Sequence, residues 1–114
     1  MTLYGLPNCN TVKKAQDALK INNVAYTFHD FKKKGITKEK LQEWFDAFGW
    51  EKVINKQGLT FKKLNAAEKE AINSAAAAIE YLLNNTSAIK RPVLEQNGRP
   101  ISIGFNEDIY AKFK

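Results

Sequence analysis

The sequence contains one cysteine, Cys9, and one histidine, His29, among its 114 residues. A single cysteine excludes an internal disulfide framework and any zinc site built from several cysteines. No run of about 18 apolar residues is present, so we expect no transmembrane helix. The first residues lack a basic segment followed by an apolar one, which predicts a cytoplasmic protein without a secretory signal.

Proline and glycine are also sparse, with 3 and 6 residues, and no segment has the composition of a linker. Hydrophobic residues make up 44% and charged residues 26%, which is close to ordinary globular usage. A chain of 114 residues with this composition predicts a single domain, residues 1–114, built around one core.

Positive charge is unevenly distributed along the chain. Lysine and arginine total 18 against 12 acidic residues, a net charge of +6, and the whole excess lies in residues 1–66. Only Arg91 and Arg99 are arginines. A guanidinium binds oxyanions through a planar fork that lysine lacks, so each is a candidate anion ligand as well as an ordinary surface cation.

The N-terminal third predicts a strand, a helix and a second strand. Residues 2–4 are apolar and are followed by a turn containing Pro7, after which Asn8 is the expected helix cap. Residues 24–31 are aromatic and β-branched with alternating polarity, which is typical of a strand. A βαβ unit of this length has parallel strands.

The middle third predicts helices and loops. Residues 32–35 and 50–64 are expected to be irregular, and Gly49 ends the helix between them. Three residues are expected to cap helices in this part of the chain: Thr37, Asn65 and Ser74. Glu68, three residues after Asn65, is expected to complete a capping box with it.

The C-terminal third returns to strand periodicity. Residues 92–96 and 99–103 flank Asn97 and Gly98, a strong hairpin signal, and Asn106 is placed to cap a last helix. The order βαβ, helices, ββα predicts an α/β fold of the thioredoxin-like, glutaredoxin type. Its four-stranded mixed sheet would have a helical insertion between the βαβ and ββα units.

Cys9 is the main candidate for chemistry. It opens a helix after a strand and a turn, where unpaired N–H groups and the helix dipole lower the pKa of a thiol. Lys13 and Lys14 add positive potential. The position three residues on, where thioredoxins have a second cysteine, is Val12, so an outside thiol such as glutathione must resolve a mixed disulfide. A buried, unreactive cysteine is the alternative.

Three segments resemble a known family: LYGLPNCNTVKKA at the front, HDFKKKGI in the middle, and IKRPVL followed by GRPISIGF at the back. In this order they are similar to the ArsC-like family, over nearly the whole chain. Its members include glutaredoxin-coupled arsenate reductases, Spx transcription regulators and YffB proteins. The resemblance is closest to the YffB branch, which is similar to glutathione-dependent thiol reductases. It implies a thioredoxin-like fold with a helical insertion.

The resemblance also implies roles for individual residues. Cys9 would be the nucleophile, Arg91 would bind an oxyanion, and Pro92 would follow a cis peptide bond. Glutathione or an oxidised substrate would lie in a cleft formed by the cysteine, the Arg91–Pro92 segment and a loop in the middle of the chain. The residues expected to bind it are Asn8, Asn10, Thr11, Lys13, Asn55, Gly58, Pro92, Gly104 and Phe105.

Three functions follow from these residues. The predicted function is that of a glutathione-dependent monothiol oxidoreductase with glutathione as co-substrate. A glutaredoxin-coupled arsenate reductase is an alternative, but family members use three arginines, and the matching positions here are Asn55, Arg91 and the neighbourhood of Gly104. An Spx-like regulator that binds the RNA polymerase α subunit is another alternative. The segment GFNEDIY suits it, and the absence of a second cysteine at Val12 argues against it.

The expected partners are glutathione, a glutathionylated or oxidised substrate, and either glutaredoxin or the RNA polymerase α subunit under the alternatives. His29 alone forms no metal site, and no phosphate-binding glycine loop is present. We therefore expect no metal, no bound nucleotide, no direct nucleic-acid contact and no membrane association.

Overall fold

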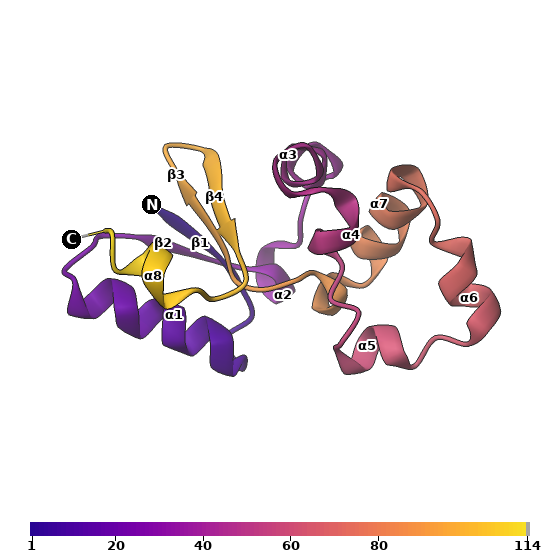
Figure 1. The fold of residues 1–114 in the computed structure, drawn as a ribbon, viewed down its shortest axis with the longest axis horizontal. Helices are drawn as coiled ribbons and strands as arrows, with labels where there is room; N and C mark the ends of the chain where they lie inside the picture. The colour runs from indigo at the N-terminus through magenta and orange to yellow at the C-terminus, as the bar shows by residue number, and fades with distance from the viewer. Residues whose placement is uncertain (114) are drawn as a thin grey trace. The chain divides into compact units, whose positions relative to one another are not determined.

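A computed structural model describes residues 1–113. Its strands are β1 (Thr2–Gly5), β2 (Thr27–Asp30), β3 (Val93–Gln96) and β4 (Arg99–Ile103) (Figure 1). Its helices are α1 (Asn10–Ile21), α2 (Phe31–Lys34), α3 (Lys38–Phe48), α4 (Trp50–Val53), α5 (Leu59–Lys62), α6 (Ala66–Ala71), α7 (Ala75–Asn84), the 3-10 turn η1 (Thr86–Ala88) and α8 (Glu107–Tyr110).

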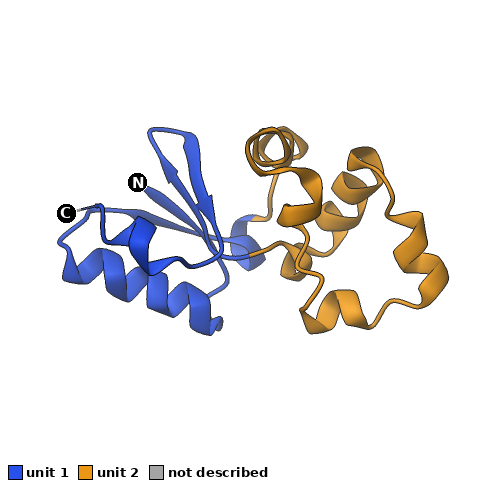
Figure 2. Cartoon of the chain, viewed as in Figure 1, with its two compact units in different colours: residues 1–34, 91–114 blue, residues 35–90 orange. Residues whose placement is uncertain are grey.

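The chain divides into two compact units (Figure 2). The first contains residues 1–34 together with the residues from Arg91 onward, and the second contains residues 35–90. A single domain over residues 1–114 stays a prediction. None of the helices in residues 1–113 is long and apolar enough to cross a bilayer.

The first unit is built on a four-stranded mixed sheet in the order β2-β1-β3-β4. Strands β1 and β2 are parallel and are connected through α1, whereas β1 pairs with β3 and β3 with β4 in antiparallel fashion. Helices α3 to α7 and η1 come between β2 and β3 in the chain. The predicted α/β fold with a mixed sheet and a helical insertion is therefore confirmed.

One face of this sheet packs against α1 and α8. The fully buried side chains of this core are Leu3, Val12, Ala15, Leu19, Leu94 and Tyr110. Gly5, at the end of β1, is in close contact with α1, since a Cβ atom there would lie 2.6 Å from Cγ2 of Val12. The first turn of α1 thus packs directly on the end of β1, and any side chain at Gly5 would push them apart.

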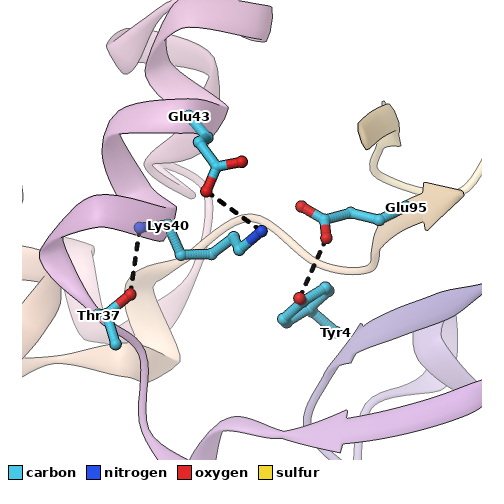
Figure 3. A network of polar contacts seen from close by, with 5 residues as sticks. All are labelled: Tyr4, Thr37, Lys40, Glu43 and Glu95. Atoms are coloured by element: carbon cyan, nitrogen blue, oxygen red, sulfur yellow. Dashed lines mark hydrogen bonds and ion pairs between the residues drawn. The ribbon is translucent and has the colours of Figure 1, made fainter. Parts of the chain in front are cut away.

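The opposite face of the sheet carries a buried carboxylate. The hydroxyl of Tyr4 on β1 donates a hydrogen bond of 3.1 Å to Oε1 of Glu95 on β3, and Glu95 is 2% exposed (Figure 3). The His29 ring lies 4.7 Å from the Tyr4 ring, centroid to centroid. A buried carboxylate is tolerated only when it is hydrogen-bonded, so Tyr4 supports Glu95.

Two expectations for the N-terminal third were wrong in detail. The N-cap of α1 is Cys9 and not Asn8. Strand β2 starts at Thr27 and not at residue 24, because Asn23 turns the chain with φ 57° and the Val24 N–H bonds to the Leu19 carbonyl at 2.9 Å. Val24 and Tyr26 instead pack on the core from outside the sheet.

The lysine-rich segment after β2 is a helical turn and not a loop. The Lys32 N–H donates to Oδ1 of Asp30 at 2.8 Å, which starts α2. In the second unit, residues 50–64 likewise contain α4 and α5. Helices of four residues are too short to show a hydrophobic period, so the sequence gives no signal for them.

The expected helix caps of the second unit are confirmed. Thr37 Oγ1 accepts from the Lys40 N–H at 3.1 Å, and the Lys40 ammonium lies 3.2 Å from Glu43 (Figure 3). Asn65 and Glu68 form the predicted capping box. Ser74 caps α7 through the Ala77 N–H.

The C-terminal hairpin and helix also follow the prediction. Asn97 and Gly98 have φ values of 54° and 77°, as a two-residue turn between β3 and β4 requires. Asn106 Oδ1 accepts from the Ile109 N–H at 3.2 Å and caps α8.

We expect Tyr4→Phe to lower the free energy of unfolding by about 1.5–3 kcal/mol, because it removes a hydrogen bond to a buried carboxylate. Urea denaturation measures this loss. The control is Tyr26→Phe, whose hydroxyl donates to the neutral Gln16 side chain at 2.9 Å in a half-buried position. It should cost about 0.5–1.5 kcal/mol. Equal losses in the two variants would contradict the role given to Glu95.

Candidate functional site

The site is organised around Cys9, which is the N-cap residue of α1. Its backbone is extended, with φ −109° and ψ 125°, and its side chain is half-buried. The first turn of α1 contains no acidic residue. The sulfur therefore lies at the positive end of a twelve-residue helix, where a thiolate is favoured over a thiol.

Thr11 makes a short polar contact to the sulfur. Its Oγ1 lies 3.0 Å from Cys9 Sγ. Either atom can donate when Cys9 is a thiol, but a thiolate has no proton, so the Thr11 hydroxyl must then be the donor. This contact thus becomes a charge-assisted hydrogen bond when Cys9 ionises.

The pKa of Cys9 results from opposing effects. Burial raises the pKa of the thiol, while hydrogen bonds from Thr11, from the Arg91 guanidinium and from the Val12 N–H lower it. The positive charge of Arg91 lowers it further, and the resulting pKa is about 7. About half of the molecules then hold a thiolate at neutral pH, against a few per cent for a thiol with the ordinary pKa of about 8.5.

Strand register brings Arg91 to the cysteine. Tyr4 of β1 lies opposite Val93 of β3 in an antiparallel pair, so the residues just before β3 run beside those just after β1. Arg91 is half-buried there, and the Arg91–Pro92 peptide bond is cis, as the family resemblance implied.

Next to Arg91, the first unit contains three of the predicted site residues: Pro92, Gly104 and Phe105. The Pro92 carbonyl accepts from the Gly104 N–H at 2.8 Å, and both residues are buried. Phe105 is half-buried, with its ring 5.1 Å from that of Tyr110. The Gly104–Phe105 segment is therefore tied to the cis peptide that follows Arg91.

The other predicted residues near the cysteine are exposed. Asn8, Asn10 and Lys13 all lie at the surface, and the Lys13 N–H donates to the Cys9 carbonyl at 3.0 Å. None of residues 1–16 is acidic. The surface around the sulfur therefore favours anions.

Asn55 and Gly58 belong to the second unit. The Asn55 N–H donates to the Ala88 carbonyl at 2.7 Å, and the Gly58 N–H donates to the Asn55 carbonyl at 3.3 Å. A Cβ atom on Gly58 would lie 2.7 Å from Nδ2 of Asn55, so the two residues form one tight turn. Their contribution to a site at Cys9 stays a prediction.

One donor to the sulfur was missed at the sequence level. The Val12 N–H lowers the Cys9 pKa, and Val12 is not among the residues predicted for the site. With Cys9 as the N-cap, Val12 is the third residue of α1, among the first N–H groups that have no partner within the helix. Within residues 1–113, no cluster of three or more His, Cys, Asp or Glu side chains could hold a metal.

Comparisons with known proteins agree with this architecture. The ArsC family model matches residues 4–113. A solved structure of a YFFB protein is 47% identical, with a TM-score of 0.90, and covers 98% of this chain and 96% of that chain. An arsenate reductase (ArsC) related protein from Brucella melitensis is 39% identical, with a TM-score of 0.77, and covers 98% of this chain and 92% of that chain.

A regulator is also among the relatives. The global transcriptional regulator Spx of Streptococcus agalactiae is 31% identical over 115 residues, which cover 99% of this chain and 82% of that protein. The family match over nearly the full length, together with these relatives, confirms the resemblance expected from the sequence. The chain belongs to the ArsC family.

Proposed function

We propose that this chain is a glutathione-dependent monothiol oxidoreductase that acts in a reducing compartment such as the cytoplasm. The observation that supports this most is the half-buried Cys9 thiol, whose pKa is lowered to about 7 by Thr11, Arg91 and the start of α1. A thiol of this kind is both a nucleophile and a good leaving group near neutral pH.

The first step uses the thiolate. Cys9 attacks the glutathione sulfur of a mixed disulfide R–S–S–G and forms a new S–S bond, while the old S–S bond breaks. The substrate leaves as R–S⁻ and takes up a proton, so its disulfide is reduced to a thiol. Arg91, Lys13 and Lys14 provide positive potential for the two carboxylates of glutathione.

The second step requires a thiol from outside the chain. A glutathione thiolate attacks the mixed disulfide on Cys9, oxidised glutathione leaves, and the Cys9 thiolate is restored. Thr11 and Arg91 stabilise that leaving thiolate as they do in the resting protein. Val12, three residues after Cys9, is fully buried against the core and has no thiol for an internal route.

The likeness to Spx supports a second candidate, a regulator that binds the RNA polymerase α subunit. The missing second cysteine at Val12 removes a dithiol switch but does not remove a binding surface. A pull-down with the C-terminal domain of the α subunit tests it. Binding by a chain that turns over no disulfide would favour the regulator over the enzyme.

Arsenate reduction has less support. The name of the relative from Brucella melitensis suggests it, but Arg91 is the one arginine at the three positions expected to hold the oxyanion. Each missing bidentate partner removes a charge-assisted hydrogen bond worth about 1.5–3 kcal/mol. We therefore favour disulfide substrates over arsenate.

Incubation with oxidised glutathione tests the proposed function. Intact mass should show one glutathione adduct, which added glutathione removes and which Cys9→Ser does not form. Because any free thiol reacts eventually, the rate constant is the informative quantity. At pH 7 we expect it to exceed that of a cysteine in an unstructured peptide by about threefold, because the thiolate fraction is about fifteen times larger while the lower pKa makes each thiolate a weaker nucleophile. A rate equal to that of the peptide would contradict the proposal.

Variants of the sulfur's partners should change the rate in a pH-dependent way. Thr11→Val and Arg91→Met each remove a group that lowers the Cys9 pKa, so the rate should fall several-fold at pH 6. At pH 9 the thiol is mostly ionised in every variant, so the difference should largely vanish for Thr11→Val, while Arg91→Met keeps the part of its loss that comes from the missing charge toward the glutathione carboxylates. The matched control is Arg99→Met, at the exposed second arginine. An equal loss at both pH values in Thr11→Val would indicate damage to the fold instead.

Val12→Cys tests the need for an outside thiol. It creates the spacing of a thioredoxin-type dithiol at the start of α1. After reaction with oxidised glutathione, we expect loss of the adduct without added glutathione and the mass of an internal disulfide. Ala15→Cys, a further turn along the same buried face, should retain its adduct at Cys9. A stable adduct in Val12→Cys would contradict the proposed geometry of the first turn.

A further inference from the structure

Three hydrogen-bond donors from two parts of the chain converge on the Cys9 sulfur. The Thr11 hydroxyl lies 3.0 Å from Sγ, and the Val12 N–H and the Arg91 guanidinium also hydrogen-bond to it. Thr11 and Val12 belong to the first turn of α1, whereas Arg91 precedes β3. Donors fixed in this way can stabilise any negative charge that forms beside the sulfur as well as that of the thiolate itself.

The reaction that gains most from such donors is the cleavage of an O–O bond. A disulfide breaks to release a thiolate whose conjugate acid has a pKa of about 8.5, and such an anion is stable in neutral water. A hydroperoxide breaks to release hydroxide or an alkoxide, and the pKa of water is about 15.7. Stabilisation of the departing atom therefore lowers the barrier more for a peroxide than for a disulfide.

Thr11 and Arg91 can follow the charge as it moves in that reaction. The negative charge passes from the sulfur to the departing oxygen, and the Thr11 hydroxyl can turn about its Cβ–Oγ1 bond to donate to it. The guanidinium has five N–H groups in one plane, so it can contact the sulfur and a neighbouring oxygen together. None of residues 1–16 is acidic, so no carboxylate of this segment opposes the developing oxyanion.

A small substrate also has access to the sulfur. Cys9 is half-buried, while its neighbours Asn8, Asn10 and Thr11 are exposed. A hydroperoxide presents its terminal oxygen to the sulfur and needs no binding cleft around the rest of the molecule. The donors at the sulfur are therefore sufficient to act on it.

We infer that Cys9 also reduces hydroperoxides, R–O–O–H, and that Thr11 and Arg91 stabilise the departing oxygen. This inference rests on the proposed function, because glutathione supplies the electrons. The Cys9 thiolate attacks the terminal oxygen, an S–O bond forms and the O–O bond breaks. R–O⁻ leaves and takes up a proton from the solvent, and Cys9 becomes a sulfenic acid, oxidised by two electrons.

Glutathione restores the thiol in two steps. One glutathione thiolate attacks the sulfenic sulfur and forms the mixed disulfide on Cys9, while hydroxide leaves and takes up a proton to become water. A second glutathione resolves the mixed disulfide as it does after disulfide reduction. In sum, two glutathione molecules become oxidised glutathione and one hydroperoxide becomes an alcohol and water. The cycle needs no second cysteine, in agreement with valine at position 12.

Stopped-flow kinetics of the full chain with hydrogen peroxide and with tert-butyl hydroperoxide test the inference, and dimedone with intact mass detects the sulfenic acid. At pH 7 we expect Cys9 to react about thirtyfold faster than a cysteine in an unstructured peptide. About threefold comes from ionisation, and about tenfold from one hydrogen bond to a charged oxygen. This advantage with either probe supports the inference, and the pair shows whether R is hydrogen or alkyl. An advantage of only about threefold with both would overturn it.

Thr11→Val separates stabilisation of the oxygen from ionisation of the thiol. At pH 9, where the thiol is mostly ionised, the rate with peroxide should fall about tenfold and by much more than the rate with oxidised glutathione. Thr11→Ser keeps the hydroxyl and should restore the peroxide rate. The matched control is Thr27→Val, at an exposed position of β2. Equal losses with the two substrates in Thr11→Val would overturn the role of Thr11.

The failure of this inference and that of the proposed function are distinguishable. If oxidised glutathione reacts faster than with the peptide while both hydroperoxides show only the ionisation effect, the inference alone fails. If a hydroperoxide reacts thirtyfold faster while oxidised glutathione reacts as with the peptide, the proposed disulfide activity fails and the peroxide step stands. Turnover should oxidise two glutathione molecules per hydroperoxide and be lost in Cys9→Ser. Unchanged turnover in Cys9→Ser would contradict the inference.

Discussion

The packing of α1 on the end of β1 is the constraint on which the rest of the site depends. Gly5 has no side chain, so Val12 approaches the strand closely and the helix must begin at the residues just before it. Cys9 is thereby held at the N-cap. The pairing of β1 with β3 is the second constraint on the site. The register that places Tyr4 opposite Val93 brings Arg91 to the sulfur.

Two opposing effects determine the pKa of the Cys9 thiol. Burial disfavours the thiolate, while Thr11, Arg91 and the Val12 N–H favour it, and the outcome is a pKa of about 7. A much lower pKa would increase the thiolate fraction but weaken the nucleophile, and the best attacking thiol has a pKa near the ambient pH. A monothiol protein must also release its own cysteine when glutathione attacks, so the same groups serve the second step.

The elements with strong local signals were predictable from the sequence. The caps at Thr37 and Asn65 and the turn at Asn97 depend on side chains and dihedral angles within a few residues, and all three are present. The N-cap at Cys9 was not predictable, because it depends on how the turn after β1 meets the helix. The proximity of Arg91 to Cys9 joins residues far apart in the chain, and only the family resemblance pointed to it.

The most direct test of this account is a titration of Cys9 by the ultraviolet absorbance of its thiolate. The chain has one cysteine, so below the tyrosine titration range around pH 10 the signal has one main source. We predict a midpoint near the pKa of about 7 that Thr11 and Arg91 produce, and an upward shift in Arg91→Met. A midpoint at the ordinary value of about 8.5, unchanged in the variant, would contradict the central claim that the fold activates this thiol.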